Sequence, residues 1–416
     1  MLFADRLSPG IRATYNRDTL AGILGAVMNG LTMPFFLMIA REKLHASQTE
    51  LGVITAAPVA GLMLAFLWAR MMEGKRKMPF AVGSWVASRS VLLLAPLVRD
   101  HTGYVVLVVM YWVLSAVAQP AYAALMKEIY PDSDRGRIMG YVRVCSYTVI
   151  AVTAALGGML LHYVTFQLVF PVAAVFGIAS ALVFSKIPTK QTTGDANVQL
   201  SEFVFGSLKI LLRDRPYRWF CAGIFVSGWA NFMVTPLFTV YQKDYLGADT
   251  RWVGVYTIVM QTAAILSYYY WGKHVDRKPP VLIIALCNLL FVGVPLSYCL
   301  ATASWMLLPG CILLGIYNSG CDLAYFNGVF HYAPRDRVPQ YQAVHLFLMG
   351  VRGMIAPLLG PWIVEWHLLS MSQMFLLATA MTMVSYLMLM NGVRMDGGTE
   401  IDAALVREPS PETVAN

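Results

Sequence analysis

Hydrophobic residues occur in long runs along the chain, and short polar segments separate them. Each run is close to the ~20 apolar residues that an α-helix needs to cross a bilayer. In hydrocarbon a helix bonds its own backbone amides, so such runs predict membrane-spanning helices. The runs lie at about 18–40, 50–70, 78–98, 103–126, 139–161, 166–187, 217–241, 252–271, 279–300, 303–328, 340–365 and 369–393. We therefore expect an all-α membrane protein of about twelve transmembrane helices.

Composition supports the bilayer as the solvent of this chain. Of its 416 residues, 58% are hydrophobic and 13% are charged, whereas soluble globular chains have about 25% charged residues. The six cysteines lie within the apolar runs and form no CxxC or Cys/His spacing. We therefore expect no metal site, no disulfide framework and no cofactor.

The distribution of Lys and Arg predicts the orientation in the membrane. By the boundaries above, 23 of the 31 basic residues lie in the N-terminus, the even-numbered loops and the C-terminal tail. Five lie on the other side, and Arg89, Arg143 and Arg352 lie inside runs. Cytoplasmic loops carry the excess of basic residues. We expect both termini in the cytoplasm, a location in the plasma or inner membrane, and no binding of nucleic acid despite the net charge of +8.

The spacing of the runs divides the chain into two halves. Residues 1–187 hold six runs, residues 217–393 hold six more, and residues 188–216 join them. The joining segment combines a polar stretch with a short amphipathic piece around Phe203 and Leu208, which we expect to lie along the cytoplasmic interface. Residues 394–416 are polar, and we expect a disordered cytoplasmic tail there.

The two halves are related to each other in sequence. An offset of 203 residues pairs Trp68 with Trp271, Tyr122 with Tyr325, Pro131 with Pro334, and Gly157 with Gly360. An offset of 202 pairs Asn29 with Asn231, Pro34 with Pro236, and Gly52 with Gly254. Six spans are thus followed by six related spans in parallel orientation. Parallel repeats related by an axis along the membrane normal are typical of one transporter architecture, in which the substrate binds near mid-membrane between the halves.

Two loops carry recognisable motifs. The loop after the eighth run reads Gly272-Lys-His-Val-Asp276-Arg277-Lys278, and the loop after the fourth run contains Pro131 followed by Arg135-Gly136-Arg137. With these motifs the chain resembles the major facilitator superfamily over nearly its whole length. That family carries G-x-x-x-D-R-x-G-R-R after its second span and a weaker copy after its eighth. The first copy is degraded here, with Glu73 in place of the Asp.

One motif of the family is missing. Drug/proton antiporters carry a Gly-Pro motif in the fifth span, and here Gly157-Gly158 has no proline. This departure argues against a drug antiporter.

Polar residues inside the runs are candidates for the solute pathway. A charge at a helix centre costs ~2.5–3.5 kcal/mol on insertion scales, so such groups usually face partners or water. The resemblance implies that spans one, four, seven and ten line a central cavity. The candidate pathway residues are Asn29, Gln119, Asn231, Asn318, Asp322, His345 and Arg352. The alternative is that these groups join helices by hydrogen bonds.

Asp322 has two possible roles, and the sequence leaves both open. Its repeat equivalent is the neutral Gln119, and Arg352 and His345 share one face of the following span. Asp322 could form a structural ion pair with Arg352 or His345, or it could carry a coupling proton. Arginines outnumber acids within the runs, which favours an anionic or amphiphilic solute.

Charged loop residues predict a gate at the cytoplasmic ends. We expect Asp276 to pair with Arg277, and Glu73 with Arg135 or Arg137, in the outward-facing state. Arg143, about one turn inside its span, is a further member of this predicted gate.

The most consistent function is secondary active transport of a small solute by alternating access, with protons as a candidate coupling ion. The chain has no HExxH, GxSxG or Walker loop, so we expect neither an enzyme nor an ATP-driven pump. The expected partners are the solute and membrane lipid, and we expect a monomer. A sensor built on a transporter fold is the alternative, because fold alone does not fix function.

Overall fold

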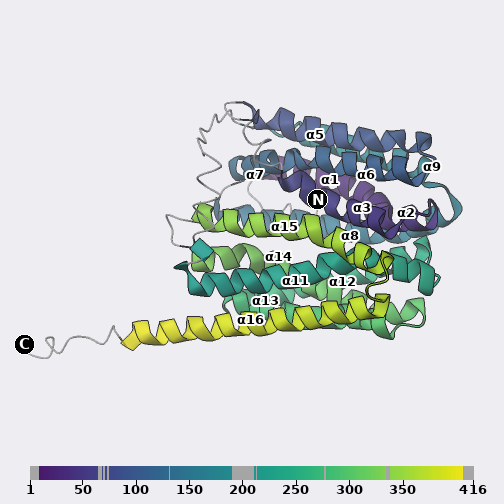
Figure 1. Cartoon of the computed structure of the whole chain (residues 1–416). Coiled ribbons are helices and arrows are strands. Elements are labelled where there is room, and N and C mark those ends of the chain that lie inside the picture. Colours follow the sequence, from purple (N-terminus) through teal and green to yellow (C-terminus); the bar gives the residue numbers. More distant parts are fainter. Residues whose placement is uncertain are drawn as a thin grey trace, which may run out of the picture.

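The computed structural model describes residues 9–63, 68, 71–72, 75–130, 132–189, 210–211, 213–275, 278–333 and 338–405. Its elements within this part of the chain are helical (Figure 1). The first half contains α1 (Pro9–Thr32), η2 (Met33–Phe35), α2 (Phe36–Glu42), α3 (Gln48–Met63), α5 (Lys77–Val91), η3 (Leu92–Leu97), α6 (His101–Ala116), α7 (Ala118–Ile129), α8 (Asp132–Tyr163) and α9 (Phe166–Phe184). The second half contains α11 (Arg215–Val240), η4 (Tyr241–Tyr245), α12 (Thr250–Val275), α13 (Pro280–Leu300), η5 (Ser304–Leu307), α14 (Leu308–Tyr332), α15 (Val338–Glu365) and α16 (Met371–Leu405).

The helices confirm the predicted membrane architecture. Within the described residues, ten helical segments are long and apolar enough to cross a membrane. The second and eighth runs correspond to α3 and α12, which brings the number to about twelve, as predicted. Several helices extend beyond the predicted runs: α1 begins at Pro9 and α8 at Asp132, and α16 continues to Leu405, beyond the end predicted at residue 393. The tail from 394 therefore begins as helix, and residues 406–416 lie outside the described part.

Prolines lie at some breaks of the spanning helices, and other prolines lie inside continuous helices. Span four is interrupted between α6 and α7, at Val117, because Pro120 has no backbone N–H to donate to the carbonyl of Ala116. Span one changes to a 3₁₀ turn around Pro34 before α2 begins. Pro236, the repeat equivalent of Pro34, lies inside an unbroken α11, which is followed by the π-helical turn η4.

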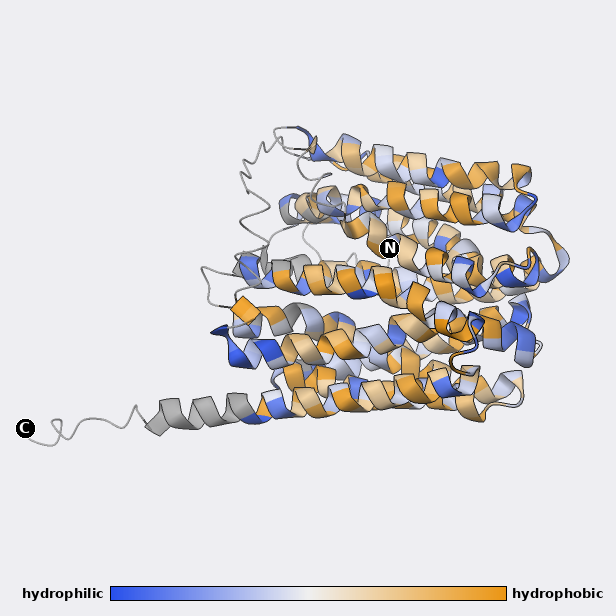
Figure 2. Cartoon of the chain, viewed as in Figure 1, coloured by the Kyte–Doolittle hydropathy of each residue, from blue (hydrophilic) through white to orange (hydrophobic). Residues whose placement is uncertain are grey.

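The bundle places its apolar surface outside as well as inside. Figure 2 shows hydrophobic residues along the length of the helices and hydrophilic residues gathered at the two ends. Leu168 is 64% exposed and Leu266 is 71% exposed. Such exposure is unfavourable in water, but a bilayer accommodates it.

The two halves meet along two seams. In the first half α1 packs on α8 and α9, and in the second half α13 packs on α14 and α16. Between the halves, α8 packs on α12 and α3 packs on α15. Figure 1 accordingly shows α5, α6 and α9 on one side of these seams, and α13 and α16 on the other.

Glycines that are equivalent in the repeat lie in both seams. A Cβ at Gly52 would overlap the carbonyl of Pro357 on α15, and one at Gly254 would lie 2.8 Å from the carbonyl oxygen of Ala154 on α8. Small residues let helix backbones approach closely within a membrane. The Gly52–Gly254 match therefore has a structural cause, because each glycine is the contact point between the halves in its own seam.

Candidate solute pathway

The predicted pathway residues lie on helices of both halves. Asn29 lies on α1 beside a cavity, and on α11 the Asn231 Oδ1 accepts a hydrogen bond from Thr235 Oγ1 at 3.3 Å. Gln119 on α7 and Asn318 and Asp322 on α14 are exposed. Gln119 and Asp322 thus keep a similar, accessible environment in the two repeats.

Asp322 accepts a hydrogen bond from a tyrosine that contacts the other half. The hydroxyl of Tyr268, on α12, donates to Asp322 Oδ2 at 2.7 Å. The Tyr268 ring stacks on Tyr147 of α8, with ring centroids 5.9 Å apart and planes 15° from parallel. This contact spans the α8–α12 seam, so the carboxylate of Asp322 is linked to both halves.

The expected ion pair of Asp322 with Arg352 or His345 does not form between these described residues. Arg352 is 4% exposed, its Nη1 donates to the carbonyl of Ile224, and its Nε is buried without a hydrogen-bond partner. His345 is buried, with its ring 6.0 Å from that of Tyr325. The Arg352 guanidinium extends instead toward α11, where Gly228 leaves room for it.

Most of the predicted cytoplasmic gate lies outside the described part of the chain. Glu73, Asp276 and Arg277 fall there, as do the side chains of Arg135 and Arg137. Arg143 is described: it is exposed on α8 and borders the same cavity as Asn29.

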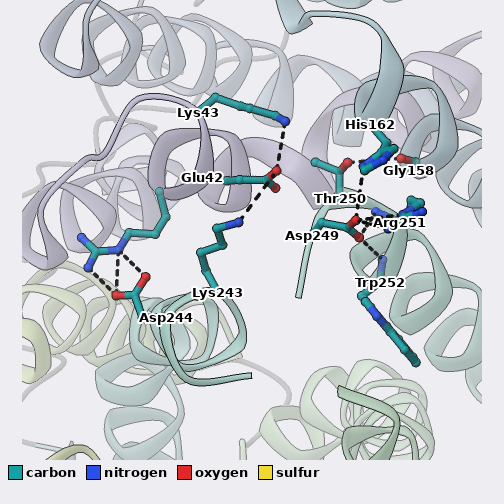
Figure 3. Close-up of polar contacts among 11 residues, drawn as sticks. Glu42, Lys43, Gly158, His162, Lys243, Asp244, Asp249, Thr250, Arg251 and Trp252 are labelled. Carbon is teal, nitrogen blue, oxygen red and sulfur yellow. Dashed lines mark hydrogen bonds and ion pairs between the residues drawn. The ribbon is translucent and has the colours of Figure 1, made fainter. Parts of the chain in front are cut away.

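A set of charged residues joins the halves where α2 meets η4 (Figure 3). We call this region, with the first residues of α3 and α12, the α2–η4 end. Arg41 Nε lies 3.1 Å from Asp244 Oδ2 and 3.2 Å from Asp244 Oδ1, and Arg41 Nη2 also contacts Oδ2. Glu42 Oε1 lies 3.0 Å from Lys43 Nζ and 3.9 Å from Lys243 Nζ of the other half. Of these residues, only Arg41, Lys43 and Lys243 entered the count of basic residues, and no pairing was predicted for them.

Two further polar contacts close the seams at the same end. The Thr49 backbone N–H donates to Glu365 Oε1 at 2.9 Å, and its hydroxyl donates to Oε2 at 2.5 Å. In the other seam, His162 Nδ1 lies 3.2 Å from Asp249 Oδ2, a short contact that lacks the geometry of a hydrogen bond. Burial raises the pKa of Asp249, but hydrogen bonds from Arg251 and the backbone N–H of Trp252 outweigh it, so the pKa lies below its usual value. Asp249 is therefore an ionised acceptor at neutral pH.

These contacts follow the internal repeat. The offset of 202 that pairs Pro34 with Pro236 and Gly52 with Gly254 makes Arg41 equivalent to Lys243, and Glu42 equivalent to Asp244. The repeat therefore relates the Arg41–Asp244 pair to the Glu42–Lys243 contact. His162 and Glu365 are equivalent by the offset of 203, and each reaches from the end of α8 or α15 to the start of α12 or α3. The two offsets were a usable signal for these contacts, and no prediction was drawn from it.

The first half also contains a cavity of about 240 Å³. Its lining includes Asp18, Gly25, Asn29, Trp85, Arg89, Tyr122, Arg143, Ser146 and Ser180. Asp18 is 4% exposed and accepts a hydrogen bond from the Tyr130 hydroxyl at 2.8 Å. Asp18 is the first residue of the first predicted run and was not among the predicted pathway residues.

Comparison with known proteins decides the family. A family model described as Major Facilitator Superfamily matches residues 19–338. The chain belongs to this superfamily. A search of curated proteins found no match.

Solved structures of the superfamily's fold resemble the whole chain. A bacterial homolog of the human lysosomal transporter Spinster, in an inward-facing and unoccupied conformation, shares 13% identity with a TM-score of 0.62, covering 93% of this chain and 98% of the other. A mutant of the nucleoside transporter NupG shares 10% identity with a TM-score of 0.73, covering 91% and 99%. At these identities the likeness shows the fold. Superfamily membership and the apolar helices together establish a multi-pass integral membrane protein of a transporter family.

Proposed function

We propose that this chain is a secondary active transporter, which moves a small solute across the membrane by alternating access. The observation that carries the proposal is the pair of repeat-related seams, each closed by a polar contact at the α2–η4 end. A few charged contacts and glycine-lined backbone contacts are a suitable interface for rocking one half against the other. Each contact is individually weak, so it can break and re-form during a cycle.

The proposed topology places both termini and the 188–216 segment in the cytoplasm, because the basic residues are concentrated there. The α2–η4 end is then extracellular. Contacts between the halves at that end correspond to an inward-facing state. In this arrangement residues 1–187 and 217–393 are the two moving halves.

The solute pathway would lie between the halves, with polar residues contributed by both. Asn29, Gln119, Asn231, Asn318 and Asp322 are its candidate wall residues, and His345 and Arg352 support the second half from within. Asp322 is the candidate proton carrier, because its carboxylate is exposed and accepts a hydrogen bond from Tyr268. The predicted cytoplasmic gate of Glu73, Arg135, Arg137, Arg143, Asp276 and Arg277 would close when the α2–η4 end opens.

Reconstitution into proteoliposomes distinguishes a transporter from a sensor. Purified protein would first be screened by thermal shift against sugars, nucleosides, organic anions, amino acids and lipophilic drugs, since a ligand of the native state raises its apparent stability. The ligands found would then be tested for uptake and counterflow in proteoliposomes. Saturable uptake that depends on the protein is expected. Saturable binding without uptake or counterflow would refute transport and favour a sensor.

A further inference from the structure

The cavity in the first half contains a cation that no described acid neutralises. Arg89 of α5 lines it, and the hydrogen bond that the structure gives this side chain runs from Nη1 to the backbone carbonyl of Gly177. Asp18 lines the same cavity, but its carboxylate accepts the hydroxyl of Tyr130 and makes no ion pair with Arg89. A guanidinium within a membrane-spanning bundle is costly unless charge or hydrogen bonds compensate it. The donors of Arg89 that face the cavity are therefore available to a ligand.

The surrounding helices are built to hold this arginine. A Cβ at Gly177 of α9 would lie 2.8 Å from Arg89 Cδ, and one at Gly25 of α1 would lie 4.0 Å from Arg89 Nη2. Glycine on α9 thus provides space for the arginine stem, and Gly25 on α1 lies in ordinary contact distance of its head. Trp85 fixes the guanidinium from a third side, with the Arg89 Cζ 5.3 Å from the ring centroid.

The rest of the lining is partly aromatic and partly polar. Trp85 packs edge-on against Phe184, with centroids 5.1 Å apart, and lies 5.7 Å from the Tyr122 ring. Asn29 and Ser146 add neutral polar groups at the wall formed by α1 and α8. A flat apolar body fits against the aromatic side, and a carboxylate matches the planar fork of donors that Arg presents.

From this arrangement we propose that the cavity binds a small organic carboxylate, anchored by Arg89. The cavity of about 240 Å³ has room for a carboxylate on a single ring or a short chain. As a site for the carried solute, this inference rests on the proposed transport function. Binding itself does not depend on transport. Arg89, to which sequence analysis assigned no role, becomes the anchor of the site.

Binding can be measured on the full-length protein in detergent, with benzoate and lactate as probes and benzamide and lactamide as their neutral counterparts. We expect both carboxylates to raise the unfolding midpoint with saturation, and the amides to leave it unchanged. Arg89→Gln should weaken carboxylate binding by roughly ten- to a hundredfold, the cost of a lost charge-assisted hydrogen bond. Arg89→Lys should weaken it less, because the charge remains. Arg99→Gln, which removes an exposed cation, is the matched control and should bind as the wild type does.

If Arg89→Gln does not fold, a second variant can still test the proposal. Ser146→Leu places a larger side chain in the cavity and keeps Arg89, so it should also abolish carboxylate binding. Equal stabilisation by acids and amides would overturn the proposal. The proposal would also be overturned if Arg89→Lys and Ser146→Leu left carboxylate binding unchanged. It would be overturned as well if neither benzoate nor lactate changed the unfolding midpoint.

Uptake of labelled benzoate into proteoliposomes separates the two proposals. Binding that depends on Arg89 without any uptake would refute transport and leave the anion site. Uptake that does not depend on Arg89 would refute the anion site and leave transport. Uptake that falls with Arg89→Lys and Ser146→Leu would support both.

Discussion

At the scale of single residues, the neighbours of Asp322 change the role that can be assigned to it. It is exposed on α14 and bonded to Tyr268, whereas Arg352 is buried against α11. Removing its charge therefore strands no buried cation. We expect Asp322→Asn to express like the wild type, to lose pH-driven accumulation, and to retain solute exchange in proteoliposomes.

Tyr268→Phe is the matched control for this test. It removes the hydrogen bond but keeps the acid, so pH-driven accumulation should persist. Normal pH-driven accumulation by Asp322→Asn would remove the proton-carrier role. Poor expression of that variant would instead indicate a structural role for the carboxylate.

A glycine beside the cavity gives a stability prediction. A Cβ at Gly177 would collide with Met28 Sδ and lie 2.8 Å from Arg89 Cδ. Overpacking of this kind costs about 1–3 kcal/mol, so Gly177→Ala should lower the unfolding midpoint in detergent. Gly83→Ala on α5 is the control, because a Cβ there meets nothing within 4 Å. An equal midpoint for both variants would contradict the packing at Gly177.

Sequence indicated which residues were unusual at this scale, but not what they contact. Asp322 and Arg352 were recognised as polar groups inside runs, and their pairing was inferred from spacing along two neighbouring spans. Spacing along a helix fixes a face, whereas the direction of a long side chain depends on where neighbouring helices leave room. Gly228 and Gly177 leave that room for Arg352 and Arg89, and their role becomes visible only when the helices are packed together.

At the scale of elements, the length of the apolar runs predicted the spans well. The positions of the prolines alone did not predict where the helices break. Pro34 lies in a 3₁₀ turn, yet its repeat equivalent Pro236 lies within a continuous helix. The local sequence signal is the same in both places. Membrane helices tolerate proline where neighbouring groups satisfy the freed carbonyl, and this depends on packing that differs between the halves.

The seams offer an element-scale prediction. A Cβ at Gly254 would lie 2.8 Å from the carbonyl oxygen of Ala154, so Gly254→Ala should push α12 away from α8. The reporter is Ala46→Cys, a fully buried position beside the α2–η4 end, in a background without native cysteines. An impermeant maleimide should label it faster in Gly254→Ala than in the parent.

Gly272→Ala on the same helix is the control, because a Cβ there meets nothing within 4 Å. It should leave the labelling rate unchanged. Equal labelling in both glycine variants would show that the seam does not hold the α2–η4 end closed.

At the scale of the whole molecule, topology is the first quantity to measure. The excess of basic residues predicts that the 188–216 segment is cytoplasmic. In a cysteine-free background, Ser201→Cys should react with an impermeant reagent only after cells are opened. Labelling of Ser201→Cys in intact cells would reverse the orientation, and the α2–η4 end would then be the cytoplasmic one.

The sequence predicted the two-half architecture but placed the gate at one end only. Basic loop residues were counted only to assign orientation, so Arg41 was counted and was not matched with Asp244. By the offset of 202, Arg41 is equivalent to Lys243 and Glu42 to Asp244, so a pseudo-two-fold axis relates the Arg41–Asp244 pair to the Glu42–Lys243 contact. Reading charges through the repeat would have pointed to these contacts, whereas the Thr49–Glu365 contact depends on how α3 and α15 meet.

The Arg41–Asp244 pair allows the sharpest test of how the halves are held. Both side chains are partly exposed, at 23% and 34%. Exposed pairs contribute ~0.2–1 kcal/mol, so Asp244→Asn should shift the balance toward an open α2–η4 end by roughly up to fivefold. Faster maleimide labelling of Ala46→Cys would report the shift.

Reversing the two charges distinguishes pairing from a general effect of charge. The double change Arg41→Asp with Asp244→Arg restores a pair of opposite charges between the two halves. We expect Arg41→Asp alone to label fastest, since two acids then face each other, and the double variant to return toward the parent rate. The Arg41 contact with the Ala46 carbonyl is lost in both variants, so it cannot account for recovery. A double variant that labels as fast as Arg41→Asp would show that the ion pair does not hold this end closed, leaving Thr49–Glu365 and His162–Asp249 as the contacts that do.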